Sequence, residues 1–125
     1  MSKLLSVMKF ISENNFDVVI AYKDGATMIA CLCKMMGGNF KLVVSERNTT
    51  QSLSKRERLK FFLYRFADII VPNLHAQGDF ISGHYPNLAS KVHVITNFTD
   101  TNLFKPSESY QYSHDKTKML PIFKN

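Results

Sequence analysis

Residues 17–45 read Asp17-Val-Val-Ile-Ala-Tyr-Lys-Asp-Gly-Ala-Thr-Met-Ile-Ala-Cys-Leu-Cys-Lys-Met-Met-Gly-Gly-Asn-Phe-Lys-Leu-Val-Val-Ser45, and this stretch decides the fold. Residues 17–22 form a run of β-branched and aromatic side chains without alternation, which is typical of a strand buried on both faces. Residues 26–36 are apolar on nearly every face and end at two glycines, which predicts a helix packed against a sheet. Residues 40–45 form a second strand-like run. Strand, helix and strand in succession predict a βαβ unit with parallel strands.

The same alternation extends to both sides of this unit. Residues 2–14 carry apolar side chains at helical spacing and end at an asparagine pair. Ser54 and Glu57 have the spacing of a capping box, which predicts a helix from about residue 55 to 66. Further elements are predicted as a strand over 67–71, a modest helix over 75–85 and a strand over 91–96.

This pattern predicts an α/β fold of the Rossmann-like kind, with about four parallel strands and helices on both faces of the sheet. Residues 1–106 are expected to form the folded part. Residues 107–125 are polar at first and then interrupted by Pro121, so we expect a disordered linker and stub there. The sequence contains no G-x-G-x-x-G motif and no P-loop.

Composition places the chain among globular proteins. It has 125 residues, of which 45% are hydrophobic and 21% charged, and its net charge of +6 suits an anionic partner or simply solubility. Cys31 and Cys33 would project about 200° apart on a helix, so they cannot pair with each other and are expected to be buried. The absence of a signal-peptide pattern at the N-terminus predicts a cytoplasmic location.

Neither a transmembrane helix nor a metal site is expected. The longest apolar stretch, residues 26–36, is shorter than the roughly 20 residues that span a bilayer. The four histidines, at positions 75, 84, 93 and 114, lack the spacing of metal ligands.

Two stretches resemble the family-4 (group 1) glycosyltransferases of GT-B architecture, which have two Rossmann-like domains facing a cleft. Val94-Ile-Thr-Asn-Phe-Thr-Asp-Thr-Asn-Leu-Phe-Lys-Pro106 is similar to the N-x-x-D-x-x-x-F-x-P motif that ends the first domain, with Asn97, Asp100, Phe104 and Pro106 in register. Leu42-Val-Val-Ser-Glu-Arg-Asn48 is similar to a strand and loop of members that build bacterial surface polysaccharides. The resemblance covers roughly residues 15–106.

The resemblance implies a retaining glycosyltransferase that uses a nucleotide-sugar donor and a lipid-linked or saccharide acceptor, without a cofactor. The pathways would be those of bacterial-type surface polysaccharide, lipopolysaccharide or glycolipid synthesis, at the inner face of the membrane. The family's glycine-rich opening turn and its E-x7-E glutamate pair are absent from this sequence. We therefore expect residues 1–106 to be the latter part of the N-terminal, acceptor-side domain, and residues 107–125 to be the interdomain linker and a stub of the donor-binding domain. Such a piece has no catalytic residue of its own and is expected to be inactive alone.

A second hypothesis stays open beside the enzyme. The chain could serve as a non-catalytic α/β module that binds an anionic partner through its positive charge. Nucleic acid is not expected as that partner, because the sequence has no RNA-reading motif and only one basic helix with aromatic residues.

Ligands of open α/β sheets bind outside the carboxyl ends of the strands, and this rule selects the loops at 22–25, 45–48, 72–73 and 97–100. The candidates for an acceptor-side cleft are Asp24, Gly25, Ser45, Glu46, Arg47, Asn48 and Asn73. Arg47 could grip a phosphate or a sugar diol with two parallel hydrogen bonds, or could form an ordinary surface pair with Glu46. Asp24 could bind an acceptor hydroxyl, but an aspartate before glycine at a strand-to-helix turn is more often a cap or turn residue.

Asn97 and Asp100 are expected to be structural, because their side chains can bond to nearby backbone and fix a hinge together with Phe104 and Pro106.

The basic helix offers a separate candidate surface. Placing Leu59, Phe62, Leu63 and Phe66 on its buried face leaves Phe61 and Tyr64 exposed beside Arg58, Lys60 and Arg65. Aromatic side chains next to cations suit an anionic membrane surface. In the alternative, Phe61 and Tyr64 pack against a neighbouring part of the protein.

Overall fold

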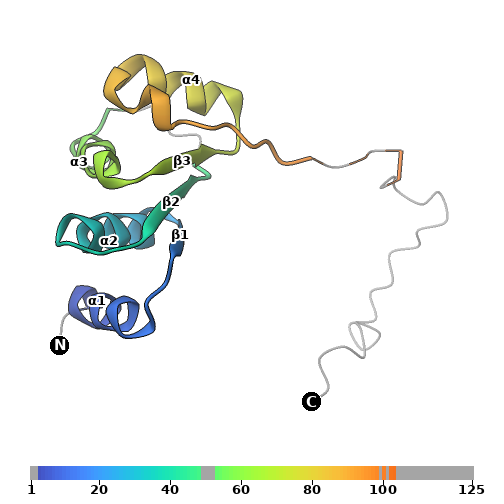
Figure 1. Ribbon diagram of the computed structural model, residues 1–125. Helices are drawn as coiled ribbons and strands as arrows, with labels where there is room; N and C mark the ends of the chain where they lie inside the picture. Colours follow the sequence, from blue (N-terminus) through green and yellow to red (C-terminus); the bar gives the residue numbers. More distant parts are fainter. Residues whose placement is uncertain (1–2, 49–52, 99, 101, 104–125) are drawn as a thin grey trace, which may run out of the picture.

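A computed structural model describes residues 3–48, 53–98, 100, 102 and 103, which form a three-stranded parallel sheet with helices packed against it (Figure 1). The elements in chain order are α1 (Lys3–Asn14), β1 (Val18–Tyr22), α2 (Asp24–Met35), β2 (Lys41–Glu46), α3 (Lys55–Leu63), η1 (Tyr64–Phe66), β3 (Ile69–Pro72), α4 (His75–His84) and η2 (Pro86–Lys91), where η marks a 3₁₀ helix.

The sheet has the order β1-β2-β3, and both pairings are parallel. Ala21 lies opposite Val44, and Val44 lies opposite Ile70, so each row of partners shares one face of the sheet. The predicted βαβ unit is therefore confirmed.

The predicted fourth strand over residues 91–96 is not formed in the described chain. Val92 makes a single parallel bridge to Ile70, and the N–H groups of His93 and Ile95 donate to the carbonyls of Ile70 and Pro72 at 2.9 and 3.0 Å. The segment thus runs beside β3 as an extended chain. It starts late because η2 occupies the chain through Lys91.

The two faces of the sheet are unequal among the described residues. One face holds buried residues such as Ala21, Val44 and Ile70, and the helices pack on this side (Figure 1). On the other face, Val18, Ile20 and Tyr22 are each about half exposed. The prediction of helices on both faces is therefore wrong for this part of the chain, because the right-handed crossovers of successive neighbouring strands put their helices on the same side.

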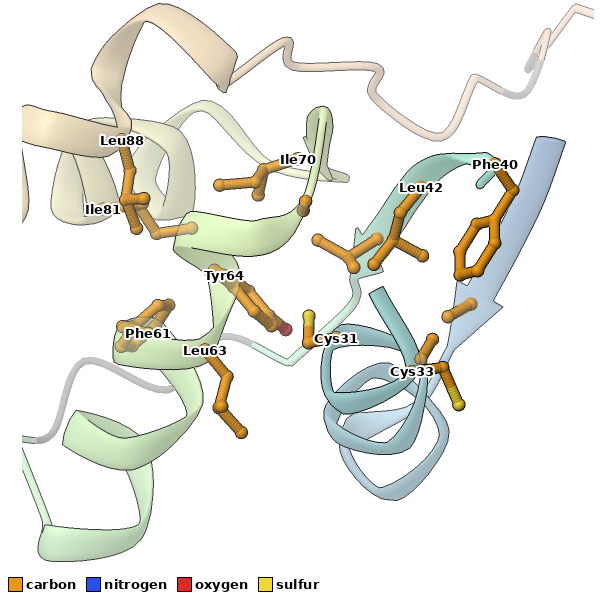
Figure 2. Packing of buried hydrophobic residues seen from close by; sticks show 14 residues of the cluster. Cys31, Cys33, Phe40, Leu42, Phe61, Leu63, Tyr64, Ile70, Ile81 and Leu88 are labelled. Atoms are coloured by element: carbon orange, nitrogen blue, oxygen red, sulfur yellow. The ribbon is translucent and has the colours of Figure 1, made fainter. Parts of the chain in front are cut away.

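The hydrophobic core lies between the covered face and the helices, and Figure 2 shows its buried side chains. Cys31 and Cys33 of α2 are unpaired and buried, as predicted. Burial raises the pKa of Cys31 to about 12 and also raises the pKa of Cys33. Both thiols therefore act as small apolar side chains.

Glycine is required where α4 meets the chain after η2. A Cβ built on Gly78 would lie 2.6 Å from a methyl carbon of Val94 and 3.6 Å from one of Val92. Gly78 therefore lets α4 approach the extended segment closely.

Helix α3 begins as the capping box predicts, because the Ser54 hydroxyl accepts the N–H of Glu57 at 3.3 Å and donates to the Glu57 carboxylate at 2.7 Å. The predicted orientation of this segment is correct for Leu63 and Phe66, which are buried and partly buried, but wrong for the other four positions, where the alternative of packed Phe61 and Tyr64 holds. Phe61 and Tyr64 are 1% and 0% exposed, whereas Leu59 and Phe62 are 51% and 52% exposed.

The physical reason lies in the neighbours of α3. The Phe61 ring packs 4.8 Å from the ring of Tyr85 and 6.3 Å from that of Phe80, while Tyr64 meets it edge-on at 5.5 Å. Phe80 belongs to α4 and Tyr85 follows it, whereas Tyr64 belongs to η1. Phe61 is therefore buried by rings from the α4 region, and α3 also contacts α2. Phe104, Pro106 and residues 107–125 lie outside the described residues.

Candidate functional site

Polar groups converge where β1 and β2 end, at the carboxyl edge of the sheet. Lys23 connects β1 to α2 with φ 69° and ψ 146°, a conformation that side chains with a Cβ rarely adopt. Backbone strain of this kind costs about 1–3 kcal/mol and is concentrated at functional sites. The strained turn places Asp24 in the first turn of α2, next to the end of β2.

A buried charged cluster lies just below this turn. The Lys60 ammonium is 3.0 Å from Oε2 of Glu46 and 3.4 Å from Oδ1 of Asp24. The side chains of Lys60 and Glu46 are 2% and 1% exposed, respectively, so this ion pair is dry. Two charges removed from water are tolerable only when they are paired and hydrogen-bonded, and this pair meets that condition.

Tyr64 is the last member of the charged cluster and contacts Glu46. Its hydroxyl donates to Oε2 of Glu46 at 2.7 Å, the same oxygen that Lys60 contacts. Burial, followed by the charge of Glu46 and the hydrogen bond to it, raises the pKa of Tyr64 well above its usual range. The phenol therefore remains protonated and acts as a fixed hydrogen-bond donor.

Asp24 links this cluster to the surface. Its Oδ1 accepts a hydrogen bond from the Asn48 side-chain amide at 3.3 Å, and its backbone carbonyl accepts from the Thr27 hydroxyl at 2.9 Å. Because its side chain is 29% exposed, Asp24 is the member of the cluster that a ligand could reach.

Arg47 is exposed at the same edge and lies over the ring of Tyr22, with 5.6 Å between the guanidinium carbon and the ring centroid. A guanidinium held on an aromatic face keeps its N–H groups available at the ring's rim. Arg47 therefore lies at the carboxyl edge on the side of Tyr22, which belongs to the face of the sheet that the helices leave uncovered. Contact of Arg47 with the 97–100 loop is not among the described interactions.

Two buried acceptor atoms at this edge have no hydrogen-bond partner among the described residues, namely Oε1 of Glu46 and Oδ1 of Asn73. The Asn73 N–H donates to the Glu46 carbonyl at 3.2 Å, so the two residues are adjacent across the ends of β2 and β3. Buried acceptors without donors are rare in folded proteins, and each marks a place where a water or a ligand hydroxyl would be stabilised.

The structure thus brings together Asp24, Glu46, Asn48 and Asn73, whereas the described contact of Arg47 is with the Tyr22 ring. Ser45 lies opposite Tyr22, on the face of the sheet that the helices leave uncovered. Gly25 is exposed and has open space where a Cβ would stand, so the site does not depend on its being glycine.

The Asp100 side chain bonds to the backbone of the residues that follow it. Its carboxylate accepts from the N–H groups of Asn102 and Leu103 at 2.9 and 3.4 Å. Asn97 is exposed, and the described interactions include none from its side chain.

Sequence reasoning placed Lys60 and Tyr64 on a membrane-facing surface, whereas they hold the candidate site from inside. Their spacing of four residues puts them on one side of a helix, and that side carries one cation and one phenol that could meet a carboxylate. The spacing of Lys60 and Tyr64 could have predicted this cluster only if Glu46, 14 residues before Lys60, had been recognised as their common partner.

The fold and this edge define a parallel α/β protein with an electrostatically organised site at the carboxyl ends of its strands. The sequence matches no protein-family model, and no curated protein matches it. The described residues contain no group of three metal-ligating side chains, and none of their helices is long and apolar enough to cross a membrane.

Proposed function

We propose that this chain is the acceptor-side part of a retaining, nucleotide-sugar-dependent glycosyltransferase of GT-B architecture. Its products would belong to bacterial-type surface polysaccharides, lipopolysaccharides or glycolipids. A lipid-linked or saccharide acceptor would bind at the carboxyl edge of the sheet, on the cytoplasmic side of the membrane. The donor would be bound mainly by a second domain that carries the E-x7-E pair.

One observation carries this proposal: the polar cluster at the ends of β1 and β2. The dry Lys60–Glu46 pair holds the partly exposed carboxylate of Asp24 in place at 3.4 Å from the ammonium. Sites that must orient hydroxyl groups need such prearranged acceptors on rigid elements, because disordered acceptors would lose conformational entropy when the ligand binds and so weaken the binding.

Each exposed group has a distinct role in this proposal. The Asp24 carboxylate would accept a hydrogen bond from an acceptor hydroxyl, with the Asn48 amide fixing its direction. The Arg47 guanidinium would bind a phosphate of the acceptor's lipid carrier or of the donor's leaving group. The unpartnered Glu46 and Asn73 oxygens would hold an ordered water beneath the sugar.

The test is a titration of the isotope-labelled full chain with a short-chain isoprenyl diphosphate sugar, followed by amide NMR. Shifts should be confined to residues 22–25 and 45–48. Arg47→Ala should weaken binding by roughly tenfold, which corresponds to one lost charge-assisted contact. Lys9→Ala, an exposed cation on α1, is the matched control and should leave binding unchanged.

The same titration distinguishes the acceptor-site proposal from the alternative, in which the chain is a non-catalytic module that binds an anionic partner. If inorganic diphosphate alone produced the same shifts with the same affinity, the sugar would contribute nothing. That result would overturn the acceptor-site proposal in favour of the binding module.

A further inference from the structure

The outward side of α3 carries a surface that the candidate site does not use. Three apolar side chains, Leu53, Leu59 and Phe62, are exposed there by 40 to 52%. Leu59 and Phe62 are three residues apart on α3 and therefore lie on one side of the helix. Leu53 precedes the N-cap Ser54 and lines the same depression as Phe62. We name these residues, together with Arg58 and Arg65, the α3 surface.

Cations border these apolar side chains. The Arg65 guanidinium lies over the Phe62 ring with 4.5 Å from its central carbon to the ring centroid, and the Arg58 side chain is anchored by a 3.2 Å hydrogen bond to the Leu53 carbonyl. Lys55 and Arg56 are also exposed in the first turn of the helix. Glu57, the single acidic residue of α3, is bonded to Ser54.

The α3 surface is hollowed rather than flat. A depression of about 410 Å³ is lined by Leu53, Arg58, Phe61, Phe62, Arg65, His84, Tyr85 and Asn87. Its wall includes the edge of the Phe61–Tyr85 ring contact, and two of its lining residues are arginines. A small anionic group with an adjoining apolar chain would match both parts of this lining.

We infer that the α3 surface docks on an anionic phospholipid membrane. Phe62, Leu59 and Leu53 enter the boundary between headgroups and acyl chains, where half-exposed apolar side chains lose their remaining contact with water. Arg58 and Arg65 then lie at the level of the lipid phosphates, whose negative charge attracts both guanidinium groups.

The chemistry of the surface favours lipid over nucleic acid. Nucleic acids are bound by cations and by aromatic rings that stack on bases, and the aliphatic Leu53 and Leu59 would gain nothing from either contact. An anionic membrane stabilises both the apolar side chains, through its acyl chains, and the arginines, through its phosphates. The docking does not require sugar binding at the carboxyl edge, so its failure and the failure of the proposed function are separate results.

The test is co-sedimentation of the full chain with phosphatidylcholine vesicles that do or do not contain phosphatidylglycerol. Binding is expected only with phosphatidylglycerol, and it should fall as the ionic strength rises. Phe62→Ser and Leu59→Ser should each weaken binding roughly tenfold, and Arg65→Gln roughly fivefold. Circular dichroism checks that each variant remains folded, as the exposure of these side chains predicts.

The matched controls are Phe10→Ser and Lys9→Gln, which remove an equally exposed aromatic side chain and an exposed cation from α1. These two should bind like the original chain. Equal weakening by the controls, equal binding to uncharged vesicles, or no binding at all would overturn the inference. Release from the vesicles by a short DNA duplex at equimolar phosphate would also overturn it, in favour of a nucleic-acid surface.

Discussion

Helix α3 presents two opposite sides of nearly equal hydrophobicity, and the protein uses them for different purposes. The inner side carries Phe61 and Tyr64, which are almost fully buried, together with the buried Lys60. The outer side carries Leu59 and Phe62, which are half exposed. Hydrophobicity along the helix therefore does not distinguish the core side from the surface.

The difference comes from what lies beside each side chain. Tyr85 supplies an aromatic partner for Phe61 at 4.8 Å, and Glu46 supplies an acceptor for Tyr64 at 2.7 Å. Among the described residues, Leu59 and Phe62 on the outer side have neither kind of partner, and Arg65 covers Phe62 only in part. Contacts with distant parts of the chain thus determine which of the similar faces of this helix is buried. Lys60 can be buried because its ammonium pairs with the carboxylates of Glu46 and Asp24.

The largest expected effect tests the inner side. Phe61→Ala should lower the free energy of unfolding by about 3–5 kcal/mol, since it removes a fully buried ring and leaves a cavity. Phe62→Ala, one position along the chain, should change it by about 0.5 kcal/mol or less. Denaturant titration measures both. Similar losses for the two variants would mean that the two sides are not distinct.

The buried charge should be nearly as sensitive. Lys60→Met leaves Glu46 buried without its counter-ion, and breaking such a pair costs about 3–5 kcal/mol. The double variant Lys60→Met with Glu46→Gln should recover part of this loss. Exposed Lys55→Met is the control and should be nearly neutral. If Lys60→Met proved equally neutral in thermal unfolding, the charged cluster would not be dry.

A smaller effect is expected from a single hydroxyl. Tyr64→Phe keeps the ring but removes the donor to Glu46, which should cost about 1–2 kcal/mol in denaturant titration. Tyr22→Phe changes an exposed tyrosine in the same chemical way and should leave stability unaffected. An unchanged stability in Tyr64→Phe would show that the hydroxyl is dispensable.

The pH dependence of the free energy of unfolding tests the role of the Tyr64 hydroxyl in a second way. Because the pKa of Tyr64 is raised in the folded state, its contribution is complete below the ordinary tyrosine pKa of about 10. As the pH rises above that value, the unfolded chain loses a proton that the folded chain keeps, so stability falls by up to about 1.4 kcal/mol per pH unit. Unfolding measured between pH 9 and about 11 should show a shallower decline in Tyr64→Phe. Identical slopes would contradict the assignment.

The smallest effect belongs to the exposed cation of the candidate site. Arg47→Ala should change the melting temperature by about a degree or less, because the side chain is exposed and contacts only the Tyr22 ring among its described interactions. The same variant is expected to lose ligand affinity. A loss of several degrees, measured by calorimetry, would make Arg47 a structural tie and remove it from the site.

Much of the fold was predictable because it rests on local signals. The apolar runs of β1 and β2 and the apolar helix between them specify a parallel βαβ unit, since a strand and its parallel neighbour need a crossover. The Ser54–Glu57 box sets where α3 begins. The carboxyl-edge rule also located Asp24, Glu46 and Arg47, because strand ends can be read from the strands themselves.

Only the tertiary structure decided which side of α3 is buried, that a lysine and a tyrosine support the site, and that helices cover one face of the described sheet. It also decided that residues 92–95 bridge β3 without forming a full strand. Each of these depends on partners distant in sequence, such as Glu46 for Lys60 and Tyr85 for Phe61. Periodicity records how strongly a residue avoids water, whereas burial also depends on the neighbour that replaces the water.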